Sequence, residues 1–171
     1  RRMRQRMRAR TLVGQAAASI IAVMLRASPV KIEEARRSDL AGIRWLLEFE
    51  RLPTDDLTEQ SLESFLVCRD DRGVIGAVGI ELFGSIALLR SLVVADSFRR
   101  DGLGERLAAA AEALARRLGA RSIYLLTTSA ERFFAKRGYR ELPRTEAPPE
   151  IRGTTQFSSL CPSTAVLMVK P

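Results

Sequence analysis

From Pro29 onward, segments with apolar side chains at helical spacing alternate with short apolar runs that are typical of strands. Residues 38–50 place apolar side chains on one helix face, behind Ser38 or Asp39 as the N-cap. A short apolar segment at 30–35 precedes this helix and predicts a strand. Three apolar runs separated by short turns then predict consecutive strands at 65–70, 74–84 and 85–95.

The remaining segments predict further helices and strands. Asp55 and Asp56 can cap a second helix that ends near Phe65, and Gly119 can end a long helix that begins at Gly102. The order of elements predicts one α/β domain around a mixed sheet flanked by helices. The last elements are strands at 121–128, 139–143 and 163–170, a helix at 129–138, and a short helix or turn at 148–153.

Charge is distributed unevenly along the chain. Residues 1–28 contain seven arginines and no acid, which leaves 21 basic and 20 acidic residues for the rest. We expect residues 1–28 to be an N-terminal extension outside a domain at 29–171; a basic helix on a membrane surface is the alternative. Because the domain itself is nearly neutral, we expect neither nucleic acid nor a membrane as its partner.

The sequence contains no histidine, which excludes His-based triads and most zinc or iron sites. Its two cysteines, Cys68 and Cys161, lie far apart. We therefore expect no metal, and we expect a reducing, cytoplasmic compartment. Cys68 lies on a predicted strand and is expected in the core.

A glycine turn joins the strand that ends at Val94 to the long helix. Its spacing is R-x-x-G-x-G on Arg99, Gly102 and Gly104, which fits neither a dinucleotide fingerprint nor a Walker loop. Glycines there allow the backbone to approach a pyrophosphate, with N–H groups of residues 100–105 pointing at it. Taken alone, the same turn could be a plain connection between strand and helix.

The stretch 89–128 resembles the acetyl-CoA-binding core of the GNAT N-acetyltransferase superfamily, as does the segment 130–139 with Ala130, Gly138 and Tyr139. The resemblance implies a GNAT-type domain with a mixed, mostly antiparallel sheet of about six to seven strands. It implies acetyl-CoA as co-substrate and a small-molecule amine as acceptor, in a monomer or homodimer. It assigns the coenzyme to Leu92, Val93, Val94, Arg99, Arg100, Gly102, Leu103, Gly104 and Glu105.

The resemblance also implies the mechanism. A gap between the strand ending at Val94 and the strand at 123–126 would admit the pantetheine arm, and N–H groups near Val93 and Val94 would hold the thioester carbonyl. The family's leaving-group acid is a tyrosine, but this chain has Phe134 there. Protonation would then fall to water or to a hydroxyl such as that of Thr128 or Ser129, which should slow transfer rather than abolish it.

Two charged residues are candidates for the acceptor's chemistry. Glu81 is the acid on the apolar strand before the strand of Val94 and is a candidate general base; it could equally be a solvent-facing residue. Arg90 could hold an acceptor carboxylate in a bidentate pair, or it could pair with an acid such as Glu81. Arg152 could be a second anchor or a solvated surface residue.

The C-terminal part is similar to a branch that contains N-acetylglutamate synthase domains and small acetyltransferases of bacterial arsenic-resistance clusters. The shared features include Thr127, Thr128 and the segment 159–165. They imply an amino-acid-like acceptor that contacts Arg90, Thr127, Thr128 and Cys161, and a link to arsenic resistance. Cys161 could instead be a packed small residue.

Two rival functions follow from the same residues. Phe134 favours a non-catalytic acyl-CoA-binding or regulatory domain, and the arginines before residue 11 favour a nucleic-acid-binding arm. Turnover of acetyl-CoA with an amine separates the first rival from the enzyme.

Overall fold

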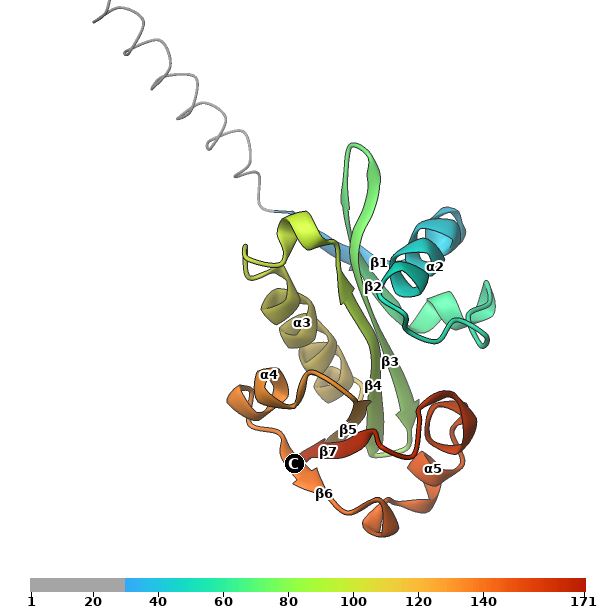
Figure 1. Cartoon of the computed structure of the whole chain (residues 1–171), viewed down its shortest axis with the longest axis vertical. Helices are drawn as coiled ribbons and strands as arrows, with labels where there is room; N and C mark the ends of the chain where they lie inside the picture. The colour runs from blue at the N-terminus through green and yellow to red at the C-terminus, as the bar shows by residue number, and fades with distance from the viewer. Residues whose placement is uncertain (1–29) are drawn as a thin grey trace, which may run out of the picture. The chain divides into compact units, whose positions relative to one another are not determined.

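Seven strands form one sheet, as the sequence predicted, in the order β1-β2-β3-β4-β5-β7-β6 (Figure 1). The structure is a computed structural model and describes residues 30–171, so the predicted extension over residues 1–28 lies outside the described residues. All neighbouring strands are antiparallel except β4 and β5. The strands are β1 (Ile32–Glu34), β2 (Phe65–Asp70), β3 (Gly73–Phe83), β4 (Ile86–Val94), β5 (Ser122–Thr127), β6 (Arg140–Leu142) and β7 (Val166–Lys170).

Four α-helices accompany the sheet within the described residues, together with short 3-10 turns and one π-helical turn. The helices predicted from residues 38, 102, 129 and 148 are all present, with shorter bounds. They are α2 (Leu40–Phe49), α3 (Leu103–Arg117), α4 (Glu131–Lys136) and α5 (Pro149–Arg152). The π-helical turn covers Gln156–Leu160.

The second helix predicted after Asp55 is wrong. Only a 3-10 turn at Gln60–Ser64 forms there, and Phe65 already begins β2. The side chain of Arg44 on α2 explains the difference, because it donates to the carbonyl of Thr54 at 3.2 Å and to that of Leu57 at 2.7 Å. These bonds satisfy the carbonyl groups of the connection without a helix.

Helices α2 and α3 cover opposite faces of the sheet (Figure 1). Ala77 and Val93 pack with Ile43 and Leu47 in a core cluster on the α2 face. On the other face, α3 approaches β3 closely at Gly76, where a Cβ atom would lie only 2.9 Å from the Leu107 side chain. The two helices thus cover both faces of β3 and β4, and the second half of β4 lines the site.

Strands β4 and β5 separate inside the sheet. Their parallel pairing consists of Ile86 with Ser122, Ala87 with Ile123, and Leu88 with Tyr124. Beyond Leu88 no pairing joins them, although β4 runs on to Val94 and β5 to Thr127. Alternate N–H groups of a strand point to opposite sides, so those of residues 89–94 that point away from β3 have no strand to bind.

The free part of β4 also contains a bulge. Ala77 pairs with Val93 but Gly79 pairs with Arg90, so two residues of β4, Ser91 and Leu92, lie opposite one residue of β3. Ser91 adopts a left-handed backbone conformation with φ of 54°. Bulges of this kind redirect side chains near functional sites.

Candidate active site

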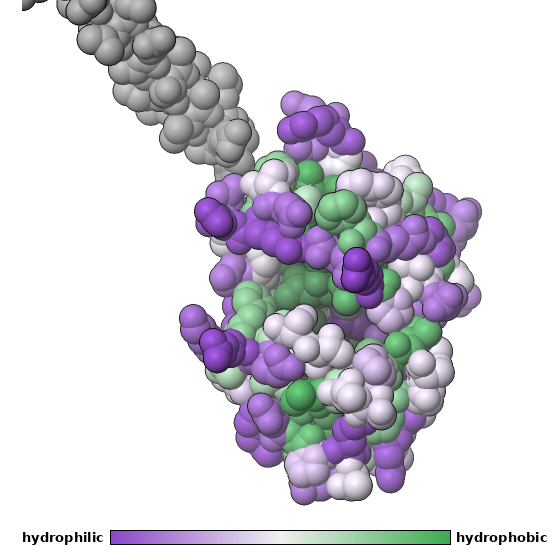
Figure 2. All heavy atoms as spheres, in the orientation of Figure 1, coloured by the Kyte–Doolittle hydropathy of each residue, from purple (hydrophilic) through white to green (hydrophobic). Residues whose placement is uncertain are grey.

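A cavity of about 650 Å³ opens where β4 and β5 separate. Its wall combines residues 89–94 of β4 with residues 125–130, the segment 50–53 after α2, and residues 160–162. On the face shown in Figure 2, hydrophobic residues line the hollow and hydrophilic residues surround it. The gap predicted between the two strands is therefore present as a cavity.

The start of α3 forms one end of this cavity. Gly102 has φ of 69°, a left-handed conformation that favours glycine, and no side chain caps the helix. A Cβ atom on Gly104 would meet only Val94 at 3.8 Å and Phe133 at 4.0 Å, so the backbone there is open to the cavity. An uncapped helix start with open backbone N–H groups suits a phosphate.

The predicted coenzyme residues divide into two groups. Leu103 is buried, with its side chain near Gly76, so only its backbone could serve a ligand, whereas the exposed Arg100 lies outside the cavity wall. Gly102 likewise offers backbone alone. The residues that line the cavity are Leu92, Val93, Val94, Arg99, Gly104 and Glu105.

Arg99 connects the glycine turn to the end of α2. Its guanidinium pairs with Glu50 and, at 3.1 Å, with Asp96, and its Nε donates to the carbonyl of Val94 at 3.1 Å. Glu50 lines the cavity as well. No local pattern predicts this ion pair, because Glu50 lies at the end of a helix 49 residues before Arg99.

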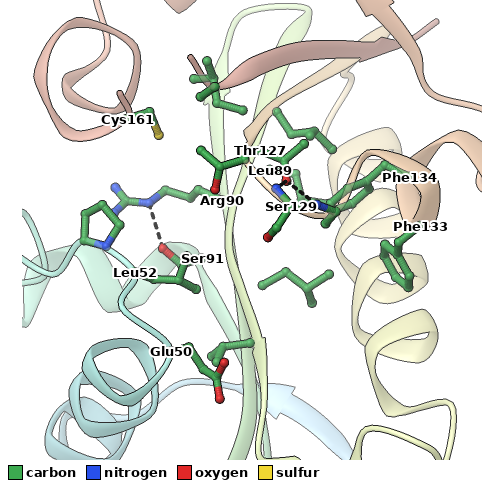
Figure 3. Close-up of a pocket in the computed structure, with 18 of the residues that line it drawn as sticks. Glu50, Leu52, Leu89, Arg90, Ser91, Thr127, Ser129, Phe133, Phe134 and Cys161 are labelled. Carbon is green, nitrogen blue, oxygen red and sulfur yellow. Dashed lines mark hydrogen bonds between the residues drawn. The ribbon is translucent and has the colours of Figure 1, made fainter. Parts of the chain in front are cut away.

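Arg90 lies in the cavity wall (Figure 3), but two carboxylates already hold its buried guanidinium. Nη1 pairs with Asp56 and, at 2.8 Å, with Glu81, while Nη2 donates to Asp56 at 2.6 Å. Nε donates to the Oγ of Ser91 at 3.3 Å. The pairing with an acid, which the sequence left open, is the arrangement observed.

This pairing revises the predicted roles of Arg90 and Glu81. Four of the five N–H donors of Arg90 are occupied, so no bidentate fork remains for an acceptor carboxylate. Glu81 does not line the cavity and meets the site only through Arg90, so its position does not favour a general base. Burial alone would raise the pKa of Asp56, but the hydrogen bonds and charge of Arg90 outweigh it and lower that pKa.

The end of β5 places hydroxyl groups opposite β4. Thr127, Thr128 and Ser129 all line the cavity. The Oγ1 of Thr127 accepts hydrogen bonds from the backbone N–H groups of Ala130 at 2.9 Å and Ser129 at 3.3 Å (Figure 3). Thr127 therefore fixes the turn into α4, and its own hydroxyl hydrogen stays available.

Phe134 lines the cavity at the position where the family has a tyrosine. It is buried and makes edge-to-face contacts with Phe133, at 4.9 Å between ring centroids, and with Tyr139, at 5.3 Å. Among the described residues that line the cavity none is a tyrosine. Hydroxyl groups in the same wall come instead from residues 127–129 and from Ser91.

Cys161 lines the cavity beside the π-helical turn (Figure 3). Its Sγ donates to Oε1 of Gln156 at 3.5 Å, and Nε2 of Gln156 donates to Asp56 at 3.4 Å. Burial raises the pKa of the Cys161 thiol, so it is protonated at neutral pH. Cys68 is fully buried in β2, and burial raises its pKa to about 11.

Other observations limit the chemistry of the described part. Within residues 30–171 no group of three His, Cys, Asp or Glu side chains could hold a metal ion. No helix in that range is long and apolar enough to cross a bilayer. Arg152 is exposed on α5 and does not line the cavity, so the structure does not favour it as an anchor.

Comparison with known proteins agrees with the geometry. Residues 61–141 match the family model of the acetyltransferase (GNAT) domain. The uncharacterized N-acetyltransferase CT2212 of Chlorobaculum tepidum is 30% identical over 113 residues, which are 65% of this chain and 72% of that protein. The chain therefore belongs to the GNAT acetyltransferase family, whose acyl donor is acetyl-CoA, and the predicted enzyme class is confirmed.

Longer relatives share this domain. An amino-acid acetyltransferase of Ralstonia nicotianae is 29% identical over 131 residues, which are 71% of this chain but only 29% of that protein. The N-acetylglutamate synthase of Neisseria gonorrhoeae, solved with coenzyme A and N-acetyl-glutamate, aligns over 82% of this chain and 34% of its own, with a TM-score of 0.72 at 23% identity. Rv2747 of Mycobacterium tuberculosis, solved with CoA and NLQ, aligns over 81% of this chain and 97% of its own, with a TM-score of 0.70 at 20% identity.

Proposed function

We propose that this protein transfers the acetyl group of acetyl-CoA to the nitrogen of a small primary amine. The observation that carries the proposal is the unpaired edge of β4 beyond Leu88, which leads to the uncapped start of α3. An extended pantetheine arm can bind the free N–H and C=O groups of residues 89–94, and the pyrophosphate can bind the backbone N–H groups near Gly104.

In the reaction, the amine nitrogen attacks the thioester carbonyl, a C–N bond forms, and the C–S bond breaks. Backbone N–H groups near Val93 and Val94 would stabilise the developing oxyanion. Coenzyme A leaves as a thiolate, which is a fair leaving group because a thiol pKa is about 8.5. Glu50 is held by Arg99 and Glu81 lies outside the wall, so the amine loses its proton to water in the cavity or to Glu105, the remaining acid of the wall.

The acceptor we propose is amino-acid-like. Two relatives with this domain are named amino-acid acetyltransferases, at 29% and 26% identity. Leu52, Pro53, Leu160 and Pro162 line the cavity together with the polar residues Arg51 and Cys161. This combination of apolar and polar groups suits a small amine that also carries a polar group.

A thiol-release assay tests the proposal. Acetyl-CoA is offered with single amino acids and, in parallel, with the matched amines that lack the carboxylate. Release of coenzyme A that depends on the acceptor supports the enzyme. Tight binding of acetyl-CoA with no release for any amine would favour the non-catalytic acyl-CoA-binding domain, which the phenylalanine at position 134 suggests.

A role in arsenic resistance is a narrower proposal, based only on the resemblance of the C-terminal segment. Cys161 is the one thiol in the cavity wall, and a single protonated thiol binds trivalent arsenic weakly. Such a role would therefore act through acetylation of an arsenic-containing amine. Acetylation of that amine by the purified protein is the direct test.

We also propose that residues 29–171 suffice for fold and activity, in a cytoplasmic setting and without a nucleic-acid or membrane partner. Both cysteines are free, as a reducing compartment would leave them. A shortened chain that begins at Met24 should melt within a few degrees of the full chain. A fall in melting temperature that corresponds to a loss of about 1–2 kcal/mol in unfolding free energy would contradict a domain boundary at residue 29.

A further inference from the structure

Two residues of the described chain other than glycine have a left-handed backbone, and both line the cavity. Arg51 has φ of 56° and Ser91 has φ of 54°. They belong to different elements, the end of α2 and the bulge of β4. Strain of this kind collects at functional sites, because the surrounding structure must hold it there.

The backbone around Arg51 is fixed. Its N–H donates to the carbonyl of Glu48 at 3.0 Å, and the N–H of Leu52 donates to the carbonyl of Leu47 at 2.8 Å. These bonds end α2 in the way that usually requires glycine. An arginine thus occupies a position where glycine would be the less strained residue.

The cavity wall contains three arginines, and their partners differ. Arg90 is occupied by Asp56, Glu81 and Ser91, and Arg99 by Glu50, Asp96 and the Val94 carbonyl. No hydrogen bond or ion pair engages the guanidinium of Arg51 within residues 30–171. All five of its N–H donors are available to a ligand.

We infer that Arg51 anchors the carboxylate of the acceptor and thereby makes the site prefer an amino acid to a simple amine. This inference rests on the proposed function, because an acceptor must first be acetylated. A guanidinium with free donors can grip a carboxylate at two points, which Arg90 no longer can. Glu50, the acid next to Arg51 in the cavity wall, is already engaged by Arg99.

Because the backbone of Arg51 is left-handed, a glycine substitution can distinguish a ligand-binding role of this residue from a structural role. Replacement by glycine removes the guanidinium and relieves the backbone at the same time. A residue retained for stability should lose stability on replacement, whereas Arg51→Gly should melt at the same temperature or higher. Arg51→Lys keeps one positive charge but loses the planar fork, so its effect should be intermediate.

The test compares KM values of the full chain for one amino acid and for its decarboxylated amine. For Arg51→Gly we expect KM to rise about tenfold for the amino acid and less than twofold for the amine and for acetyl-CoA. Arg117→Ala, which removes an exposed arginine at the end of α3, is the matched control and should change neither value.

The outcomes distinguish the two proposals. An equal rise of both KM values, or no rise, would overturn the inference while the enzyme stands. A wild type that acetylates only amines without a carboxylate would overturn it too. A wild type that releases no thiol with any amine would refute the proposed function itself.

Discussion

The Nη2 atom of Arg90 lies 2.6 Å from the Oδ1 atom of Asp56, across 34 residues of sequence. Asp56 belongs to the connection after α2, and Gln156 from the π-helical turn donates to the same carboxylate. Glu81 of β3 completes the group around Arg90. The Asp56 carboxylate thus links Arg90 of β4 to the π-helical turn that precedes Cys161.

Replacement of Arg90 should therefore disturb the fold more than the choice of acceptor. Arg90→Ala leaves two carboxylates without their partner, which costs about 3 kcal/mol by comparison with other buried pairs. A urea titration should detect this loss, and activity should fall alike for an amino acid and for its decarboxylated amine. A selective loss for the amino acid alone would restore Arg90 as the carboxylate anchor.

Filling the open backbone at the start of α3 should block the coenzyme. Gly104→Leu projects a side chain into the cavity, so the Kd for coenzyme A should rise at least about tenfold, or about 1.4 kcal/mol. Ala113→Leu adds the same side chain on an exposed position of the same helix and is the control. Calorimetry measures both, and equal affinity in a folded Gly104→Leu variant would contradict the coenzyme site.

The phenylalanine in the cavity wall offers a gain-of-function test. Phe134→Tyr supplies a hydroxyl where the family has one, and kcat should rise roughly threefold to tenfold. The expected gain is modest because a thiolate leaves fairly well without a proton, so an acid helps it less than it would help a poorer leaving group. Phe133→Tyr adds the same hydroxyl to the neighbouring ring in the same wall. If both variants leave kcat unchanged, departure of the thiolate does not need a proton donor.

Acid should weaken the fold through Glu112. This buried acid of α3 accepts from Arg137 at 3.0 Å and from Lys170 at 2.8 Å. Burial would raise its pKa, but the two cations outweigh burial and hold it below the ordinary 4.5. Because the folded pKa is lowered, the stabilisation is complete above about pH 4.5 and is lost as the pH falls through the lowered value.

Glu112→Gln tests this linkage. The variant should lose about 1.5–3 kcal/mol of unfolding free energy at pH 7, since it loses a charged hydrogen-bond partner. The difference from wild type should shrink as the pH falls below 4. A difference that stays constant between pH 7 and pH 3.5 would contradict the assignment.

The sequence predicted the strands and most helices because their apolar spacing is regular. It failed after Asp55, where Leu57, Leu62 and Phe65 enter the core without an α-helix because a distant arginine, Arg44, binds the carbonyl groups of the connection. The glycine turn was found because its chemistry is local. The pairing of Arg90 with Asp56 was missed because no local pattern links residues 34 positions apart.

The separation of β4 from β5 gives the sheet an edge in its interior. Three residue pairs join β1–β4 to β5–β7 along this seam. An extended ligand with its own amide groups would complete the interrupted ladder, as an added strand does at the rim of other sheets. By linkage, a coenzyme bound along this seam also stabilises the folded chain against unfolding, and the more so as its concentration exceeds the Kd. The substrate is in this sense a temporary part of the fold.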